Sequence, residues 1–300
     1  MKVLLCGDFQ ADERSEWLGA LSSAMPEAAW LDLAGARAAP ASVQAAVVAN
    51  PPPGSLQGLP ALRLIQSLWA GVDRLLADTT LPTGVPIARM VDPAMSAAMA
   101  QTALWSVLSL HRGFFAYAER QRQRVWRVHA QRRADEVRVL VLGQGEMGRA
   151  AAAAFAQQGY MLSTWRRDGT ALPPLLARAD ILVNLLPLTD ETRGLLDHRF
   201  FAALPPHASI VNLGRGAHVI DADLLAALDR GHLRHAVLDV FAVEPLPADH
   251  PYWSHPRVTM LPHAAAGTDA RSAAAVAAAN LRACRDGGEV LNVVAPKRGY

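Results

Sequence analysis

The chain has very little cysteine. Only two of its 300 residues are cysteines, Cys6 and Cys284, and they lie far apart in segments of different kinds. A disulfide framework is therefore not expected, and two reduced thiols fit a cytoplasmic protein. Long apolar runs are also missing, since no segment reaches the roughly 18 residues of a membrane-spanning helix. We expect no signal peptide either, because Gly7 and Asp8 interrupt the short apolar run at the start, which we interpret as a strand.

Net charge is almost absent. The chain has 29 Lys and Arg against 27 Asp and Glu, a formal net charge of +2, and this balance indicates neither nucleic acid nor a membrane as a partner. With 51% hydrophobic residues, a chain of 300 can bury a large core, and this length favours two domains.

One basic segment stands out between residues 112 and 133. It contains seven arginines, with Phe114, Phe115, Tyr117 and Trp126 among them. Basic residues mixed with aromatic ones can indicate nucleic-acid binding. They can equally form an arm that packs on a second subunit. The small net charge favours the arm, so we expect a homodimer and no nucleic acid.

Short apolar runs alternate with helical stretches along the chain, a rhythm typical of parallel sheets with crossover helices. In the first ninety residues we expect strands at 3–5, 45–49, 64–67 and 85–88. Further on we expect them at 137–142, 160–165, 181–185, 209–213, 236–239 and 258–261. The sequence therefore predicts an α/β fold with two doubly wound parallel-sheet domains.

The expected helices suggest how the domains divide. A long helix from about Ser96 would carry the chain into the second domain, Asp221 is placed to cap a helix at 222–229, and the last helix, at 272–285, should return to the first domain. The prediction is a flavodoxin-like substrate domain of residues 1–95 and 270–300, and a Rossmann dinucleotide-binding domain of residues 96–269 with the arm at 112–133. The ligands are expected in a cleft between them.

The most informative motif is the glycine pattern in VLVLGQGEMGRA. Gly143, Gly145 and Gly148 follow an apolar run and precede an alanine-rich stretch at 149–158. Glycine is needed in the turn, where a pyrophosphate approaches the backbone, and where the helix packs on the strand, while the helix N-terminus offers free N–H groups. The pattern alone is weak, but a strand before it and a helix after it predict a dinucleotide site, which also includes Glu146 and Met147.

The end of the next strand indicates which dinucleotide is bound. NAD-binding domains normally place an acid there to accept from the ribose 2′-OH. This chain has Arg166 and Arg167 after Trp165. Two guanidinium groups suit a 2′-phosphate, which predicts NADPH, with weaker binding of NADH. The other interpretation is that two arginines simply form a solvated strand end.

Three residues after the glycine motif could act together, and each follows a predicted strand: Arg215, Glu244 and His263. A histidine, with an ordinary pKa of about 6.5, is suited to proton transfer near neutral pH. A neighbouring carboxylate would favour the imidazolium and hold the ring, and an arginine presents a planar fork to a substrate carboxylate. Each residue alone also has a purely structural explanation, but their order after a dinucleotide motif favours reduction of a carbonyl next to a carboxylate.

At this point the chain resembles the D-2-hydroxyacid dehydrogenases, and most closely their glyoxylate/hydroxypyruvate reductase branch. The resemblance runs from SLWAGVD at 67–73 through GQGEMG, NLLPLTDETRG and VNLGRG to DVFAVEPLP and LPHAAA. It implies interconversion of 2-oxo and D-2-hydroxy acids, with Arg215 binding substrate, His263 as acid and base, and Glu244 as its partner. Formate-dehydrogenase relatives have glutamine in place of the glutamate, so Glu244 argues against that branch.

The resemblance also implies further contacts. The backbone of Trp69, Ala70 and Gly71 would hold the substrate carboxylate, and Asp239 would accept from the nicotinamide carboxamide. The remaining cofactor contacts implied are Leu186, Pro187, Thr192, Leu213 and Gly214. Trp69 is bulky where many relatives have a small residue, which would narrow the pocket unless the indole faces outward.

These observations favour NADPH-dependent reduction of small 2-oxo acids such as glyoxylate and hydroxypyruvate. A reductase of larger 2-oxo acids remains an alternative, and so does a non-catalytic protein that senses dinucleotides. A metal is not expected. The histidine pairs His232 with His235 and His250 with His255 lack the four converging ligands that zinc requires, and neither cysteine is near them in the sequence.

Overall fold

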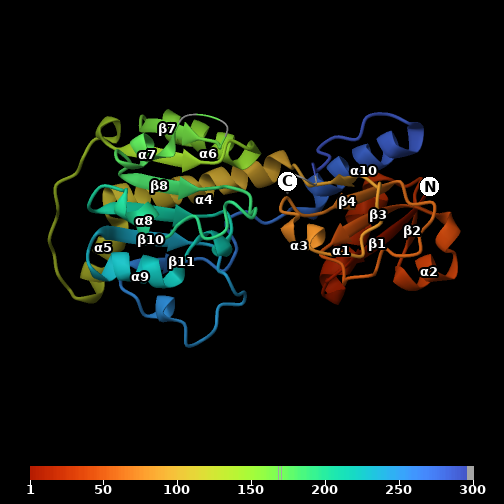
Figure 1. Cartoon of the computed structure of the whole chain (residues 1–300), viewed down its shortest axis with the longest axis horizontal. Coiled ribbons are helices and arrows are strands. Elements are labelled where there is room, and N and C mark those ends of the chain that lie inside the picture. Colours follow the sequence, from red (N-terminus) through yellow and green to blue (C-terminus); the bar gives the residue numbers. More distant parts are fainter. Residues whose placement is uncertain (168, 170, 296–300) are drawn as a thin grey trace. The chain divides into compact units, whose positions relative to one another are not determined.

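The computed structural model describes residues 1–167, 169 and 171–295. The chain divides into two units, the first made of residues 1–95 and 268–300 and the second of residues 96–267 (Figure 1). The first unit is thus assembled from both ends of the chain. The expected boundary, between 269 and 270, lies two residues further along the chain.

The first unit contains a five-stranded parallel sheet in the order β2-β1-β3-β4-β5. This is the flavodoxin-like order, and it confirms the fold class predicted for this part of the chain. Its strands are β1 (Lys2–Gly7), β2 (Ala29–Leu31), β3 (Val43–Ala49), β4 (Leu64–Ser67) and β5 (Ile87–Ala88). Its helices are α1 (Ala11–Ala24), α2 (Leu33–Ala38), α3 (Asp73–Leu76) and α10 (Ala270–Asp286), with a 3₁₀ turn at Pro40–Ser42.

Alternate residues of β1 enter cores on opposite faces of this sheet. Val3 and Leu5 pack with α1 and α10, whereas Leu4 and Cys6 pack with α2 and α3. The prediction that the last helix returns to the first domain is confirmed. Alanines form most of the buried face of α10, which lets the helix lie close to the sheet, and Asp269 caps its N-terminus by accepting from the backbone N–H groups of residues 271 and 272.

The second unit contains a six-stranded parallel sheet in the order β11-β10-β9-β8-β6-β7. The direction of winding reverses between β6 and β8, so this sheet is doubly wound as predicted. Its strands are β6 (Arg138–Leu142), β7 (Met161–Trp165), β8 (Ile181–Asn184), β9 (Ala208–Asn212), β10 (Leu233–Leu238) and β11 (Val258–Met260). Its helices are α4 (Pro93–Arg112), which contains the boundary between the units, α5 (Phe114–Arg122), α6 (Glu146–Gln157), α7 (Leu172–Leu176), α8 (His198–Ala202) and α9 (Asp221–Asp229).

Helices cover both faces of the second sheet (Figure 1). On one face, Val139 and Val141 of β6 pack with buried residues of α4 and α6. On the other, Leu140 and Leu142 pack with α7, α8 and α9. Three 3₁₀ turns complete the unit, at Ala134–Glu136, Gly216–His218 and Pro251–Trp253. Within the ranges given above, no helix combines the length and the apolar character needed to span a membrane.

Three expectations for the helices of this unit were wrong. Asp221 does not cap α9, because it is the first helical residue and its carboxylate instead accepts a hydrogen bond from the Tyr252 hydroxyl at 2.9 Å. Helix α6 begins at Glu146 rather than at Arg149, so the third glycine of the motif lies inside the helix. The long helix α4 also begins earlier than expected, at Pro93, whose fixed φ suits a first helical position, and Asp92 accepts the N–H of Ala94.

Candidate active site

The carboxyl ends of the strands of the second sheet lie in one row. Their pairing places Trp165 beside Leu142, Leu142 beside Asn184, and Asn184 beside Asn212. The row continues through Leu238 to Met260. The glycine turn, the arginine pair, Arg215, Asp239 and His263 all follow these strand ends. The register therefore brings the predicted cofactor and catalytic residues of this unit to one edge, where open parallel sheets bind ligands.

The three glycines have different surroundings. Gly143 has φ +105°, and a Cβ there would lie 2.6 Å from the carbonyl oxygen of Leu185. A Cβ on Gly148 would collide with the carbonyl of Gly143, so this glycine lets α6 pack against the turn. Gly145 caps the helix, and a Cβ there would meet no atom within 4 Å. The open space over Gly145 at a helix N-terminus fits a bound pyrophosphate.

The arginine pair lies next to this turn. The carbonyl of Trp165 accepts the N–H of Gly143 at 2.9 Å, so the chain enters Arg166 beside the glycine turn. Arg167 is half-exposed, and its guanidinium lies 3.2 Å from Glu191 and 3.4 Å from the hydroxyl of Thr189. Arg167 therefore reaches from the end of β7 to the segment after β8.

The segment after β8 folds on itself. Thr192 is buried, and its hydroxyl donates to the Pro187 carbonyl at 2.8 Å and accepts the N–H of Thr189 at 2.8 Å. Leu186 is buried too, and its N–H donates to the side chain of Asn184 at 3.2 Å. The three residues that the sequence assigns to cofactor binding here are thus held in one fixed turn.

Asp239 follows β10 and is buried. Its Oδ1 accepts the N–H groups of Ala264 at 2.7 Å and Ala265 at 3.0 Å, and its carbonyl accepts the N–H of His263 at 2.8 Å. Burial raises the pKa of this carboxyl, against the opposing effect of the two backbone hydrogen bonds. Asp239 thereby fixes the loop that carries His263, and its Oδ2 accepts no hydrogen bond from the described residues.

His263 and Glu244 form a direct pair. Nδ1 of His263 lies 2.7 Å from Oε2 of Glu244, and Oε1 of Glu244 accepts the N–H of Phe241 at 2.8 Å. The side chain of His263 is about half-exposed, with a relative exposure of 52%. Its backbone has φ +54°, an uncommon conformation for histidine, which the hydrogen bond to the Asp239 carbonyl helps to hold. The carboxylate orients the ring through Nδ1, so Nε2 is the nitrogen available to a ligand.

Arg215 follows β9 in a loop that lies against the loop of Glu244. A Cβ on Gly216 would overlap the backbone of Phe241 and Ala242, so the two loops touch through their main chains. The guanidinium of Arg215 donates to the carbonyl of Gly214 at 2.8 Å. Contacts thus run from the Arg215 loop through Phe241 to Glu244 and on to His263. Leu213 and Gly214, the predicted cofactor contacts, form the start of the same loop.

A group of buried polar residues behind this loop was not predicted from the sequence. Asn184, Asn212 and His218 are completely buried and joined by hydrogen bonds. A signal for two of them was present, because an asparagine ends each of the apolar runs ILVN and SIVN. A polar side chain at the buried end of a strand requires a partner, and a pair of such ends can supply one.

Trp69, Ala70 and Gly71 belong to the first unit and follow β4. The backbone of Trp69 is held by the hydroxyl of Ser67 and by the N–H of Met90, which donates to its carbonyl at 3.1 Å. Its indole is partly buried and contacts Trp17 edge to face, with 6.2 Å between the ring centroids. The side chain is therefore packed against the unit's own core, and a narrowing of the substrate pocket by Trp69 stays a prediction.

The histidine pairs do not converge on a metal. His232 contacts the carbonyl of Phe201, His235 the hydroxyl of Thr259, and His250 and His255 contact two different aspartates. Among the residues described, no group of three or more His, Cys, Asp or Glu could hold an ion.

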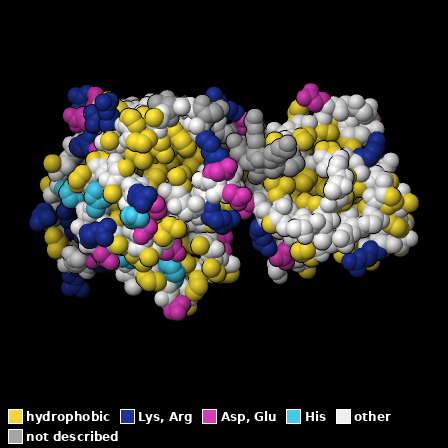
Figure 2. Space-filling model, in the orientation of Figure 1, with side chains coloured by type: hydrophobic (Ala, Val, Ile, Leu, Met, Phe, Trp, Pro, Cys, Tyr) yellow, Lys and Arg dark blue, Asp and Glu magenta, His cyan; other side chains and the backbone are white. Residues whose placement is uncertain are grey.

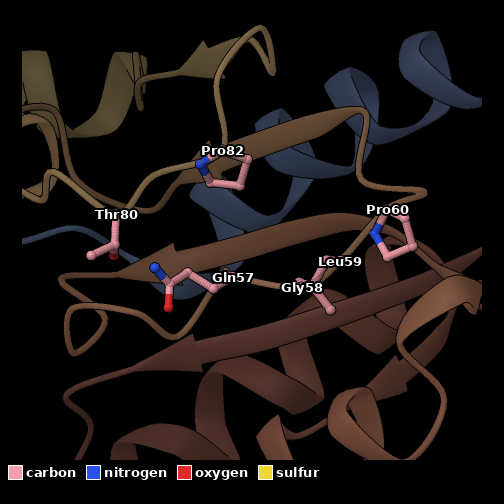
Figure 3. A pocket seen from close by; sticks show the side chains of 6 residues that line it. All are labelled: Gln57, Gly58, Leu59, Pro60, Thr80 and Pro82. Carbon is pink, nitrogen blue, oxygen red and sulfur yellow. The ribbon is translucent and has the colours of Figure 1, made fainter.

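A surface hollow of about 510 Å³ in the first unit has no catalytic chemistry (Figure 3). None of its lining residues is charged, and its one hydroxyl, that of Thr80, donates to Asp78. The hollow is lined by Gln57, Gly58, Leu59, Pro60, Thr80 and Pro82.

Comparisons with known proteins identify the family of this chain. Residues 104–265 match the family model described as D-isomer specific 2-hydroxyacid dehydrogenase, NAD binding domain. The chain is 36% identical to a glyoxylate/hydroxypyruvate reductase A of Yersinia enterocolitica, covering 96% of this chain and 97% of the relative. It is 37% identical to one of Serratia proteamaculans, covering 95% and 96%.

Solved structures give the same result. A D-isomer specific 2-hydroxyacid dehydrogenase from Xanthobacter autotrophicus, in complex with NADPH and MES, superposes with a TM-score of 0.92 at 39% identity, covering 99% of each chain. An NADPH-dependent glyoxylate/hydroxypyruvate reductase from Sinorhizobium meliloti, in complex with NADP and sulfate, has a TM-score of 0.91 at 31% identity, covering 100% of this chain and 99% of the other.

Proposed function

Because this chain belongs to the D-isomer-specific 2-hydroxyacid dehydrogenase family, we propose that it is an NADPH-dependent reductase of small 2-oxo acids, such as glyoxylate and hydroxypyruvate. The products are the corresponding 2-hydroxy acids, of D configuration where they are chiral. The observation that carries this proposal is the His263–Glu244 pair, 2.7 Å apart, at the sheet edge that also bears the glycine turn.

The residues of the second unit suit the dinucleotide. The N-terminus of α6 and the open space over Gly145 would accept the pyrophosphate, and Asp239 has an oxygen for the carboxamide. Arg166 and Arg167, the two residues that follow β7, would bind the 2′-phosphate. NADH, which lacks that phosphate, should bind more weakly. The bound cofactor supplies the hydride.

His263 and Arg215 are the side chains that act on the substrate in this reaction. His263, oriented by Glu244, delivers a proton from Nε2 to the carbonyl oxygen of the substrate. Arg215 binds the substrate carboxylate and stabilises the charge that develops on the oxygen. For the first unit we propose that the backbone of residues 69–71 also binds the carboxylate.

We further propose that the protein is a cytoplasmic homodimer that uses residues 112–133 as the contact arm. Support comes from the exposed apolar side chains there: Phe114 and Val125 are about half-exposed, Val128 is 80% exposed and Trp126 fully exposed. On the face drawn in Figure 2, acidic side chains accompany the basic ones, which gives no support to nucleic acid as the partner. Both cysteines are free, which supports a cytoplasmic location. Light scattering tests the role of the arm in dimerisation. We expect the wild type to be a dimer and Trp126→Ala to be a monomer.

A spectrophotometric assay tests the activity. NADPH or NADH is mixed with glyoxylate, hydroxypyruvate and bulkier 2-oxo acids, and oxidation of the cofactor is followed, with His263→Ala as the inactive control. We expect the fastest oxidation with NADPH and the two small acids. Faster turnover of the bulky acids would indicate a reductase of larger substrates. Tight NADPH binding without any turnover would overturn the enzyme and favour a dinucleotide sensor.

A further inference from the structure

Three buried polar side chains lie behind the loop that carries Arg215. Asn184, Asn212 and His218 each have 0% relative exposure. Asn184 and Asn212 end β8 and β9, are paired in register, and are joined by a hydrogen bond of 2.9 Å from Nδ2 of Asn184 to Oδ1 of Asn212. Such groups are costly to bury unless each hydrogen bond is made, so their arrangement is tightly specified.

The contacts of His218 determine its tautomer. Nδ1 faces two donors, the N–H of Arg215 at 3.2 Å and Nδ2 of Asn184 at 2.8 Å. Nε2 lies 3.2 Å from the carbonyl oxygen of Pro187. Because a carbonyl only accepts, Nε2 carries the proton and Nδ1 accepts. His218 therefore serves as a fixed connector with an acceptor on one side and a donor on the other.

Nδ1 of His218, the acceptor, holds the backbone of Arg215 in place. The N–H of Arg215 donates to His218, and its carbonyl accepts from Nδ2 of Asn212 at 3.0 Å. The N–H of Gly214 donates to Oδ1 of the same asparagine at 3.3 Å. Both polar groups of the Arg215 backbone are thus tied to buried side chains. This fixes the direction in which the arginine side chain leaves the loop.

Nε2 of His218, the donor, holds the segment after β8 in place. The carbonyl of Pro187 accepts from Nε2 of His218 and from the Thr192 hydroxyl. Asn184, which contacts His218, also accepts the N–H of Leu186. Leu186, Pro187 and Thr192 are among the residues that we assign to cofactor binding. One imidazole therefore joins the segment for the cofactor to the loop for the substrate.

We propose that His218 is a positioning residue with two separable effects. Through Nδ1 it places Arg215 for the substrate carboxylate, and through Nε2 it places Pro187 for NADPH. The inference rests on the proposed function, because it assigns a ligand to each loop. It goes beyond that function by giving a role to a residue that does not itself contact the reacting atoms.

Two substitutions separate the two sides of the ring. In His218→Asn, the side-chain oxygen has the reach of Nδ1, so the acceptor for Arg215 is retained and the donor to Pro187 is lost. In His218→Gln, the side-chain nitrogen has the reach of Nε2, so the donor is retained and the acceptor is lost. Loss of one buried hydrogen bond should change binding by about tenfold. We expect the Asn variant to raise the KM for NADPH, and the Gln variant to raise the KM for the 2-oxo acid, each by about that factor.

The matched control is His232→Asn, which removes a donor of the same reach. His232 also contacts a backbone carbonyl, that of Phe201 at 2.9 Å, but it lies outside the site. Thermal unfolding of all variants is recorded beside the kinetics. We expect the control to lower Tm without changing either KM. If both His218 variants raised both KM values equally, or lowered Tm with neither KM changed, His218 would be a structural residue and the proposal would be wrong.

NADPH binding, measured directly by fluorescence, distinguishes a failure of this inference from a failure of the proposed function. If the wild-type protein showed no turnover, the proposed reductase activity would be refuted. Even then, His218→Asn should bind NADPH about tenfold more weakly than His218→Gln. Equal affinities in the two variants would overturn the role of His218. If neither variant folds, Thr192→Val removes the second donor to Pro187 and should weaken NADPH binding but not 2-oxo acid binding. The opposite result would equally overturn the proposal.

Discussion

Nδ1 of His263 lies 2.7 Å from Oε2 of Glu244, and the other carboxylate oxygen of Glu244 is held by the backbone of Phe241. The carboxylate therefore cannot turn away without losing a second hydrogen bond. A ring oriented in this way presents one nitrogen, Nε2, to a substrate. Nε2 is therefore the atom from which a proton can pass to the substrate oxygen in reduction.

Replacing Glu244 with glutamine should slow reduction. The amide cannot offer a carboxylate to Nδ1 of His263, so the ring loses the charge-assisted hydrogen bond that orients Nε2, and kcat should fall by roughly tenfold or more. His263→Ala should lose roughly 10²- to 10⁴-fold in kcat. The rates are measured with NADPH and glyoxylate. Glu119→Gln, in the arm, serves as a control with wild-type kcat, and a wild-type kcat in Glu244→Gln would contradict the role of this pair.

The arginine pair should determine the choice of cofactor. Charge-assisted hydrogen bonds to a 2′-phosphate are worth about 1.5–3 kcal/mol each, so Arg166→Ala combined with Arg167→Ala should raise the KM for NADPH by about 10- to 100-fold or more. The KM for NADH should change little. Arg178→Ala, an exposed arginine outside the site, is the control. Equal changes for both cofactors would show that the pair does not contact the 2′-phosphate.

The glycine turn allows binding to be separated from folding. Gly145→Ala adds a methyl group that meets no protein atom, so the fold should keep its stability, while the pyrophosphate loses its space and NADPH binds more weakly by at least about tenfold. Gly148→Ala places its methyl group against the carbonyl of Gly143 and should lower Tm markedly. Thermal unfolding and NADPH titration of both variants measure the contrast. Wild-type affinity in Gly145→Ala would refute the placement of the pyrophosphate.

His235 should make stability depend on pH. Burial, followed by the nearby charges of Arg234, His255 and Arg257, lowers the pKa of His235 to about 4. The unfolded chain, with a histidine pKa of about 6.5, then binds more protons between pH 6.5 and pH 4, so the folded state loses stability as the pH falls through this range. Between pH 7 and pH 5 the loss from this group should reach about 2 kcal/mol.

Urea unfolding at pH 7 and pH 5 measures this loss. His235→Phe cannot titrate and retains a ring to stack on Phe115, whose centroid lies 4.7 Å from that of His235. The free energy of unfolding of this variant should therefore fall less between the two pH values than that of the wild type. The same fall in both proteins would mean that His235 does not contribute to the pH dependence.

The parts of the fold that the sequence predicts are those with a strong local pattern. The buried strands β3 and β6 contain the apolar runs AAVVA and VLVL, and the glycine motif marks where a helix must follow. Strand β2 has no such run, because its three residues lie at the sheet edge, where one is exposed and two are partly buried. Of the expected strand at 85–88, only the last two residues pair with β4.

The candidate site was predictable only in part. Arg215, Glu244 and His263 follow strands and could be recognised from that position. The contact between Asp221 and Tyr252 could not be predicted, because the two residues are distant in sequence and meet only after folding. Asp221, expected to cap a helix, therefore makes a tertiary contact instead. His218 was missed for the same reason. Nothing in the local sequence distinguishes a histidine buried between two loops from one in solvent.

Helix α10 completes the first unit from the far end of the chain. Its buried alanines pack on β1 and β3, and Asn280 donates to Gln66 of β4 at 2.8 Å. A ribosome delivers residues 1–95 before the second unit, and this helix only after it. The part of the first unit that is synthesised first therefore has a sheet face covered by α1 alone until α10 is made, while the second unit can already fold.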